Sequence, residues 1–251
     1  MKNLFAGMIG AVAPFVGPAL AADVPARMPV KVTPNQVVAY NWAGVYTATS
    51  IGGGWQNIDG RSAAGGIDNT HGSRAWTGSS IGVQGMWGNW VLGVEGSYNT
   101  PFTNKFDSSA GGAANCTVVA AGFSCNSRIN NIWTMGGKAG YALGNWMVYA
   151  SGGYANGRVE ETTTLGGIIG TGSKANQSGW YGGAGVDWFV TRIWWSDLIL
   201  GVEYKHIELD DKLHGNIAGP AFNKTFSADV DTVMAKATFK WVGAGPFSAF
   251  K

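Results

Sequence analysis

The chain is poor in charged residues. Only 13% of its 251 residues are Asp, Glu, Lys or Arg, which is about half of the usual share. The net charge of +2 gives no electrostatic footprint for nucleic acid. Disorder is not indicated, because disordered segments combine high charge with low hydrophobicity and 45% of this chain is hydrophobic. A glycine-rich secreted β protein and a membrane β-barrel both remain compatible with this composition.

Long apolar runs are missing after residue 22, so no transmembrane helix is expected there. The first 22 residues have the plan of a secretory signal peptide: a short positive start at Lys2, an uncharged stretch, and small residues before the expected cleavage after Ala21 or Ala22. A transmembrane helix is the alternative, but glycines and prolines interrupt it. Residues 23–41 contain three prolines and no clear period, which predicts a flexible periplasmic leader.

Cysteine is scarce, with only Cys116 and Cys125 in the chain. Both fall in a long polar segment, 99–127, and export would bring them into an oxidising compartment. We therefore predict a disulfide between them. A metal pair or a redox motif fits neither the spacing nor the lack of histidine nearby.

Catalytic and cofactor motifs are also missing. The sequence has no HExxH, no GxSxG and no metal-ligand spacing, and its glycine-rich runs lack the strand and helix that a phosphate site requires. His206 and Ser227 could be neighbours at a barrel rim, and His206 and His214 could bind haem iron at the surface. Ordinary polar loop residues explain these side chains as well, so we expect no enzyme, no metal and no cofactor.

Glycine and aromatic residues are abundant, with 40 glycines and 12% aromatics. Most of the chain alternates with the period of two that marks β-strands. Eight segments are candidate strands, each near the roughly 9–11 residues that cross a bilayer when tilted: 44–55, 76–87, 90–98, 129–141, 146–158, 178–190, 198–207 and 232–241.

The connections between these segments differ in length. Short turns are expected at Gly88-Asn89, 142–145 and 191–197, and long loops at 56–75, 99–127, 159–177 and 208–226. Tryptophans lie beside the short turns, whereas Tyr46, Tyr98, Tyr154 and Tyr204 lie nearer the other strand ends. Two aromatic belts with turns of unequal length are typical of transmembrane β-barrels, whereas a soluble sandwich would carry ordinary surface charge.

We therefore predict an all-β fold: an eight-stranded antiparallel up-and-down transmembrane β-barrel over 42–241, with short periplasmic turns, long extracellular loops and a C-terminal tail over 242–251. A barrel of this size is just wide enough for its own side chains to fill it.

The sequence "LGVE" occurs twice, ending in Glu95 and in Glu203. Alternation puts both glutamates on the polar, inward face, where they should pair with basic residues. Glu203 could meet Lys236 or Lys240, and Glu95 could meet Arg128 or Lys138. The complete set of interior ion-pair candidates is Glu95, Arg128, Lys138, Asp187, Glu203, Lys205, Lys236 and Lys240. Basic residues outnumber acidic ones in this set, so any passage should weakly favour anions.

The segments "YNWAGVYTATSIGGGW" (40–55), "GWYGGAGVDWFVT" (179–191), "LILGVEYKHIEL" (198–209) and "DTVMAKATFKW" (231–241) resemble the small outer-membrane porin-like barrels of Gram-negative bacteria, grouped with surface-antigen and OmpA-type barrels. The resemblance implies an eight-stranded meander in the outer membrane. Such barrels usually end on an aromatic residue, whereas here Trp241 is followed by ten more residues ending in Lys251.

The expected role is that of an integral outer-membrane protein with a structural envelope function and, at most, narrow passage of small solutes. The alternative is a surface-binding protein for haem or a host ligand, acting through the extracellular loops. Expected partners are outer-membrane lipid, lipopolysaccharide and the barrel-assembly machinery, and the protein is expected to be a monomer or a weak oligomer that does not bind nucleic acid.

Overall fold

The computed structural model describes residues 40–62, 67–102, 123–165, 168–214 and 224–241. All of them belong to the unit that runs from Val37 to Lys251. Among these residues, no helix is long and apolar enough to cross a membrane.

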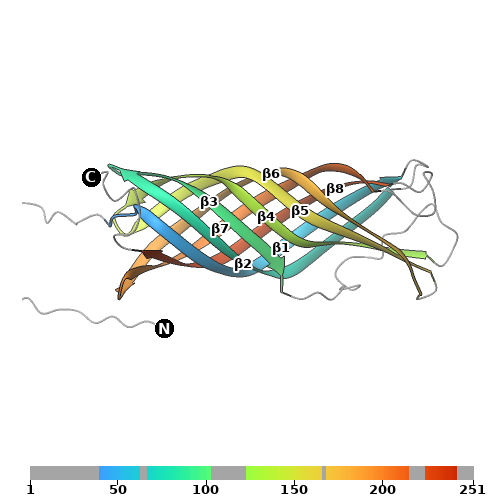
Figure 1. Cartoon of the computed structure of the whole chain (residues 1–251), viewed down its shortest axis with the longest axis horizontal. Coiled ribbons are helices and arrows are strands. Elements are labelled where there is room, and N and C mark those ends of the chain that lie inside the picture. Colours follow the sequence, from blue (N-terminus) through green and yellow to red (C-terminus); the bar gives the residue numbers. More distant parts are fainter. Residues whose placement is uncertain (1–39, 63–66, 103–122, 166–167, 215–223, 242–251) are drawn as a thin grey trace, which may run out of the picture. The chain divides into compact units, whose positions relative to one another are not determined.

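Eight strands form a closed barrel in which each strand pairs antiparallel with its neighbours in the sequence and β1 pairs with β8 (Figure 1). The predicted eight-stranded up-and-down barrel is confirmed. The strands are β1 (Gly44–Ser62), β2 (Ile67–Trp87), β3 (Trp90–Pro101), β4 (Phe123–Leu143), β5 (Trp146–Leu165), β6 (Ile168–Ile193), β7 (Ser196–His214) and β8 (Lys224–Trp241).

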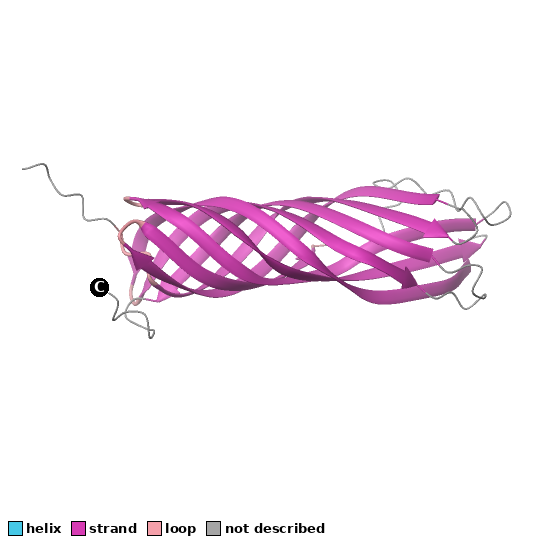
Figure 2. Cartoon of the chain, turned by 90° about the horizontal axis from the view of Figure 1, so that it is seen from above, coloured by secondary structure: helices cyan, strands magenta, loops and turns pink. Residues whose placement is uncertain are grey.

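Tight two-residue turns join the strands at one end of the barrel, which we call the turn side (Figure 2). Gly88 and Gly144 open two of these turns with φ of 59° and 67°, the left-handed conformation that Gly-Asn hairpins favour. In the third turn Trp194 takes the same conformation, with φ of 53°. All three predicted short connections are therefore found, and the opposite end is the loop side.

The strands are longer than the sequence predicted. β1 and β2 leave only residues 63–66 between them, and β5 and β6 leave only 166–167. The predicted long loops over 56–75 and 159–177 are therefore wrong for most of their length. β6 reaches 26 residues, about two and a half times the roughly 9–11 that a tilted strand needs to cross a bilayer.

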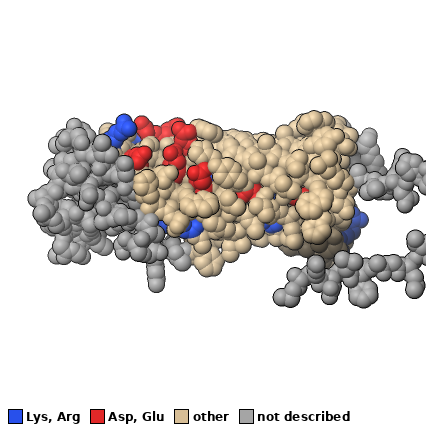
Figure 3. All heavy atoms as spheres, turned by 180° about the vertical axis from the view of Figure 1, so that it is seen from behind, with Lys and Arg blue, Asp and Glu red and all other residues tan. Residues whose placement is uncertain are grey.

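The polarity of the inner and outer faces reverses along the barrel. This reversal explains why the strand ends were missed. Near the turn side, exposed apolar side chains such as Leu92, Val94 and Val202 cover the outer wall. Near the loop side, Ile58, Ile207 and other apolar side chains point inward and are buried. Acidic residues gather on the outer wall toward the loop side, beside a wall that is mostly uncharged (Figure 3).

Two rows of exposed aromatic side chains separate these zones on the outer wall. The turn-side row consists of Trp87, Trp90, Tyr141, Trp146, Trp188, Trp194 and Trp195, and the loop-side row of Trp55, Tyr98, Trp133, Tyr154, Trp180 and Tyr204. The rows match the predicted belts except at one position: Tyr46 is 2% exposed and lies inside the barrel. We take the wall between the rows as the membrane-facing zone.

A register shift in β4 reverses the facing of its first residues. The shift lies between Ile129 and Asn131, so that Ile129 and Ile132, three positions apart, are both buried in the core. Arg128 therefore lies on the outer face, where its guanidinium contacts Glu160. The prediction that Arg128 points into the lumen is wrong, because strict alternation does not hold across a bulge.

Candidate functional site

The lumen of the barrel is filled in three layers. An apolar cluster on the loop side contains Ile58, Trp76, Ile129, Ile132, Ala155, Val159, Tyr181, Ile207, Leu209, Phe226, Ala228, Val230 and Met234. A second cluster on the turn side contains Tyr40, Trp42, Val91, Ala142, Met147, Tyr149 and Ile199. Charged side chains occupy the layer between them.

Glu95 is the centre of the charged layer. Its carboxylate lies 3.5 Å from the ammonium of Lys205 and 3.7 Å from that of Lys236, and it accepts a hydrogen bond of 2.8 Å from the Tyr46 hydroxyl. Lys205 also lies 3.1 Å from Glu203. Since β3 is not adjacent to β7 or β8, these contacts cross the lumen and connect opposite walls.

A second set of contacts ties β4 and β8 to β5 and β6. Lys138 donates a hydrogen bond of 3.0 Å to Asp187, and its ammonium lies 3.7 Å from the centre of the Tyr149 ring. Lys236 donates to the Tyr149 hydroxyl at 3.0 Å. Lys138, Asp187 and Lys236 are at most 5% exposed, so the charges compensate one another with little help from solvent.

The repeated "LGVE" corresponds to a structural repeat of the two half-barrels. Tyr46, Gly82 and Glu95 stand in one row across β1, β2 and β3, and Tyr149, Gly185 and Glu203 stand in the same row across β5, β6 and β7. Glycine is required in the middle, because a Cβ on Gly82 would lie 2.4 Å from Tyr46 and one on Gly185 would lie 2.5 Å from Tyr149. Each glycine lets a tyrosine lie flat against the inner wall.

The predicted ion pairs between adjacent strands are not the ones that form. Glu203 contacts Lys205 on its own strand instead of Lys236 or Lys240, and Glu95 makes no ion pair with Arg128 or Lys138. Lys240 contacts Asp197 at 3.4 Å. With Arg128 outside, the charged layer holds Glu95, Asp187 and Glu203 against Lys138, Lys205 and Lys236. The charges balance, so the basis for the predicted anion preference is lost.

The residues just before β1 close the turn-side end of the lumen. Trp42 is fully buried, and its carbonyl accepts a hydrogen bond of 2.7 Å from Gln84. The Tyr40 hydroxyl donates to Asp197 at 2.6 Å, and its ring stacks on Phe189 at 4.1 Å. Tyr40 thus belongs to the barrel, whereas the sequence assigned it to the leader.

Sequence reasoning missed Asp197, Gln84 and Tyr40 as interior residues. Asp197 is the last residue of the predicted turn 191–197 and was therefore expected to be solvated, although it is 0% exposed. Its carboxylate also accepts a hydrogen bond of 2.8 Å from Arg192. The period-two pattern of 76–87 could have placed Gln84 on the inner face, but glycine and serine obscure that pattern.

A very small cavity lies at the boundary between the turn-side cluster and the charged layer. It measures about 10 Å³ and is lined by residues that include Trp42, Gln84, Asp187 and Thr238. Each of these four residues has a buried polar atom without a hydrogen-bond partner. A space of this size admits about one water molecule, which could hydrogen-bond to those atoms.

An ion-pair cluster lies on the outer wall beyond the loop-side aromatic row. Arg128, Glu160 and Lys174 are direct cross-strand neighbours on β4, β5 and β6, and Glu160 contacts Arg128 at 2.7 Å and Lys174 at 2.8 Å. Partial burial opposes ionisation of Glu160. Hydrogen bonds from Lys174, Asn130 and Arg128 outweigh that effect and lower the pKa of Glu160 to about 2.

This pKa predicts a pH-dependent contribution to stability. Because the folded pKa lies below the unfolded value of about 4.3, the contribution is complete above pH ~4.3 and is lost as the pH falls toward about 2. Glu160→Gln should lower the free energy of unfolding by about 1 kcal/mol at pH 7. Urea unfolding of both proteins at pH 7, 4 and 2 checks this; a difference that stays constant down to pH 2 contradicts it.

The structure separates the residues that the histidine hypotheses placed together. His206 on β7 stands opposite Asp231 on β8 and contacts it at 2.8 Å, whereas Ser227 lies four positions further along β8, roughly 13 Å away. His206 and His214 are eight positions apart on β7, roughly 26 Å, so they do not form one site, and haem binding through either imidazole remains a prediction. In the described part of the chain, no three His, Cys, Asp or Glu side chains are grouped to hold a metal ion.

Some predictions concern residues outside the described ranges. These are the signal peptide with cleavage at Ala21 or Ala22, the leader over 23–39, the tail over 242–251 and Cys116. Cys125 lies in β4, not in the loop where it was expected. The Cys116–Cys125 disulfide remains a prediction.

Comparison with known proteins gives a family match. The model of a family described as outer membrane protein beta-barrel domain matches residues 19–237. No curated protein sequence matches the chain. Solved structures similar to it include Ail, the attachment invasion locus protein of Yersinia pestis (10% identity, 78% of this chain and 99% of that one, TM-score 0.39). Neisserial surface protein A (14%, 79% and 98%, 0.36) and OprG from Pseudomonas aeruginosa (10%, 80% and 98%, 0.35) are also similar.

Proposed function

Because this chain belongs to the outer membrane protein β-barrel domain family, we propose that it is an integral outer-membrane protein with a structural envelope role and a closed lumen. The uncharged, aromatic-bordered wall is its membrane-facing surface, in contact with lipid and lipopolysaccharide. The chain would reach the membrane through a cleaved signal peptide and the barrel-assembly machinery.

One observation carries this proposal: buried side chains of the described residues fill the lumen in three layers. Two apolar clusters enclose a charge-balanced layer, and the 10 Å³ cavity beside Trp42 holds about one water. A diffusion pore instead requires a continuous water-filled interior, as in barrels with more strands. An eight-stranded barrel filled in this way supports anchoring more than transport.

The loop-side extension supports a role at the cell surface. Strands of 19 to 26 residues in β1, β2, β4, β5, β6 and β7 exceed the roughly 9–11 residues that cross a bilayer. Their outer face beyond the loop-side row is polar, and their inner face is mostly apolar, with Gln56 and Gln177 buried among the apolar side chains. The extension would hold the connecting segments above the membrane.

Planar-bilayer recording tests the closed lumen. The full protein, purified from outer membranes in detergent and shown to be folded by its heat-dependent gel mobility, should insert without producing steady conductance steps. The reason is that ions would have to displace the buried contacts of Glu95, Lys138 and Lys236. Reproducible steps from the folded protein, with or without anion preference, would contradict the proposal.

A further inference from the structure

Hydroxyl groups of the membrane-facing wall gather on β1 and β2; on β6, the exposed Thr191 stands opposite Leu198 at the turn-side aromatic row. Between the aromatic rows, the outward positions of β3 to β8 are Leu92, Val94, Gly96, Met135, Gly137, Ala139, Val148, Ala150, Gly152, Gly182, Ala184, Val186, Leu198, Leu200, Val202, Val233, Ala235 and Ala237. None of these has a polar side chain. On β1 and β2 the corresponding positions include Thr47, Thr49, Thr77 and Ser79.

Three of these hydroxyls have no hydrogen-bond partner within the described barrel. Thr77 donates to the backbone carbonyl of Ser50 at 3.1 Å, whereas Thr47, Thr49 and Ser79 make no such contact. Thr49 and Ser79 stand directly opposite each other in the register of β1 and β2. Acyl chains offer no hydrogen-bonding groups, so hydroxyls left against lipid are unfavourable.

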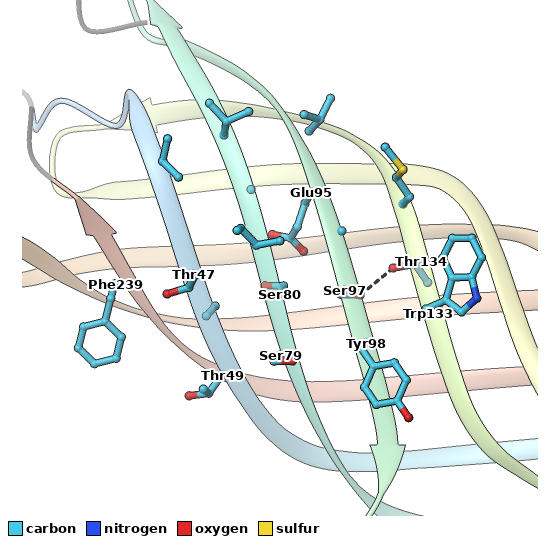
Figure 4. A pocket seen from close by; sticks show the side chains of 18 residues that line it. Thr47, Thr49, Ser79, Ser80, Glu95, Ser97, Tyr98, Trp133, Thr134 and Phe239 are labelled. Atoms are coloured by element: carbon cyan, nitrogen blue, oxygen red, sulfur yellow. Dashed lines mark hydrogen bonds between the residues drawn. The ribbon is translucent and has the colours of Figure 1, made fainter. Parts of the chain in front are cut away.

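The same hydroxyls line a depression in the wall. The depression measures about 920 Å³ and spans β8, β1, β2, β3 and β4. Thr47, Thr49 and Ser79 lie on its floor, with Phe239 on one side and Tyr98 and Trp133 on the other (Figure 4). Gly96 also lines the depression and places no side chain in it.

We propose that this depression, the β1–β2 hydroxyl face, is the interface between two copies of this chain in the membrane. A hydroxyl both donates and accepts, so a patch of hydroxyls is complementary to itself, as a two-fold interface requires. The face carries no outward charge that would need an oppositely charged partner. The exposed apolar side chains Ile81, Val94 and Met135, which also line the depression, can pack against the other copy around the hydroxyls. The proposal does not depend on whether the lumen conducts.

Disulfide cross-linking in the membrane tests which face is used. The full chain with Cys116→Ser and Cys125→Ser is expressed in outer membranes of a Gram-negative host, and a single cysteine is added. Thr49→Cys should form at least fivefold more covalent dimer under mild oxidation than Ala150→Cys, an equally lipid-facing position on β5. Equal cross-linking at both positions, or more at Ala150→Cys, would overturn the proposal.

A second measurement removes the hydroxyls without opening space. In the combined variant Thr47→Val, Thr49→Val and Ser79→Ala, the dimer dissociation constant measured by energy transfer in vesicles should rise about tenfold or more. Thr77→Val is the matched control and should leave it unchanged, because that hydroxyl is already bonded within the chain. A wild-type protein that stays monomeric, or one whose bound lipopolysaccharide falls in the combined variant instead, would overturn the second-copy assignment in favour of lipid.

Discussion

Glu95→Gln should lower the free energy of unfolding by about 3–5 kcal/mol, the usual cost of removing one partner from a buried ion pair. The carboxylate of Glu95 compensates Lys205 and Lys236 from across the lumen and accepts the Tyr46 hydrogen bond. Glutamine keeps the shape of the side chain and can still accept from Tyr46. It removes the carboxylate that Lys236 contacts, whereas Lys205 keeps its contact with Glu203.

Urea unfolding of the refolded barrel in phospholipid vesicles measures this loss. Glu203→Gln is the matched control, because Glu203 has the equivalent position in the other half-barrel and contacts one lysine, with one carboxylate oxygen unpartnered. We expect a loss of only about 1–2 kcal/mol for Glu203→Gln. Equal losses in the two variants would show that the contacts across the lumen do not add to stability.

Trp42→Ala should cost about 3–5 kcal/mol, which is typical of truncating a large buried aromatic side chain. Trp42 is fully buried in the turn-side cluster, where its ring meets that of Tyr40 edge to face at 4.8 Å. Truncation leaves a hole next to the 10 Å³ cavity and removes a contact that holds Tyr40 over Asp197. Water would then reach the charged layer from the turn side.

Two measurements check this prediction. Unfolding in vesicles should show the loss of stability. In a Thr238→Cys variant, whose side chain lines the cavity, a thiol-reactive probe should reach the new cysteine only when Trp42 is truncated. Trp194→Ala is the control, since Trp194 is 83% exposed in a turn and should cost less than about 1 kcal/mol. A Trp42→Ala barrel as stable as the Trp194→Ala barrel would mean that residues 40–43 do not support the lumen.

Much of the fold could be predicted from local pattern. Strand positions followed from period-two alternation, and the tight turns at Gly88-Asn89 and Gly144-Asn145 followed from residue types that accept a positive φ. The prediction of the strand ends failed because one rule, that apolar side chains face outward, was applied to the whole sequence. Beyond the loop-side row the rule reverses, and Ile58, Ile207 and Val230 point inward to form a core.

The lumen shows the same division between local and tertiary information. Alternation placed Glu95, Lys138, Asp187, Glu203, Lys205, Lys236 and Lys240 on the inner wall, where the structure has them. It could not give their partners, because in a narrow barrel a long side chain reaches the opposite wall as easily as the next strand. Arg128 was misplaced for a different reason: the one-residue bulge near Ile129 leaves no signal in the residue pattern.

The sequence by itself determined that this chain forms eight antiparallel strands with an apolar, aromatic-bordered wall and a polar inner face, because period, turn chemistry and composition act locally. Only the tertiary structure decided how the lumen is filled. The filling depends on groups far apart in the chain meeting at atomic distances: Tyr40 with Asp197, Glu95 with Lys205 and Lys236, and Lys138 with Asp187. Those meetings are set by the curvature and register of the whole barrel, which no single segment encodes.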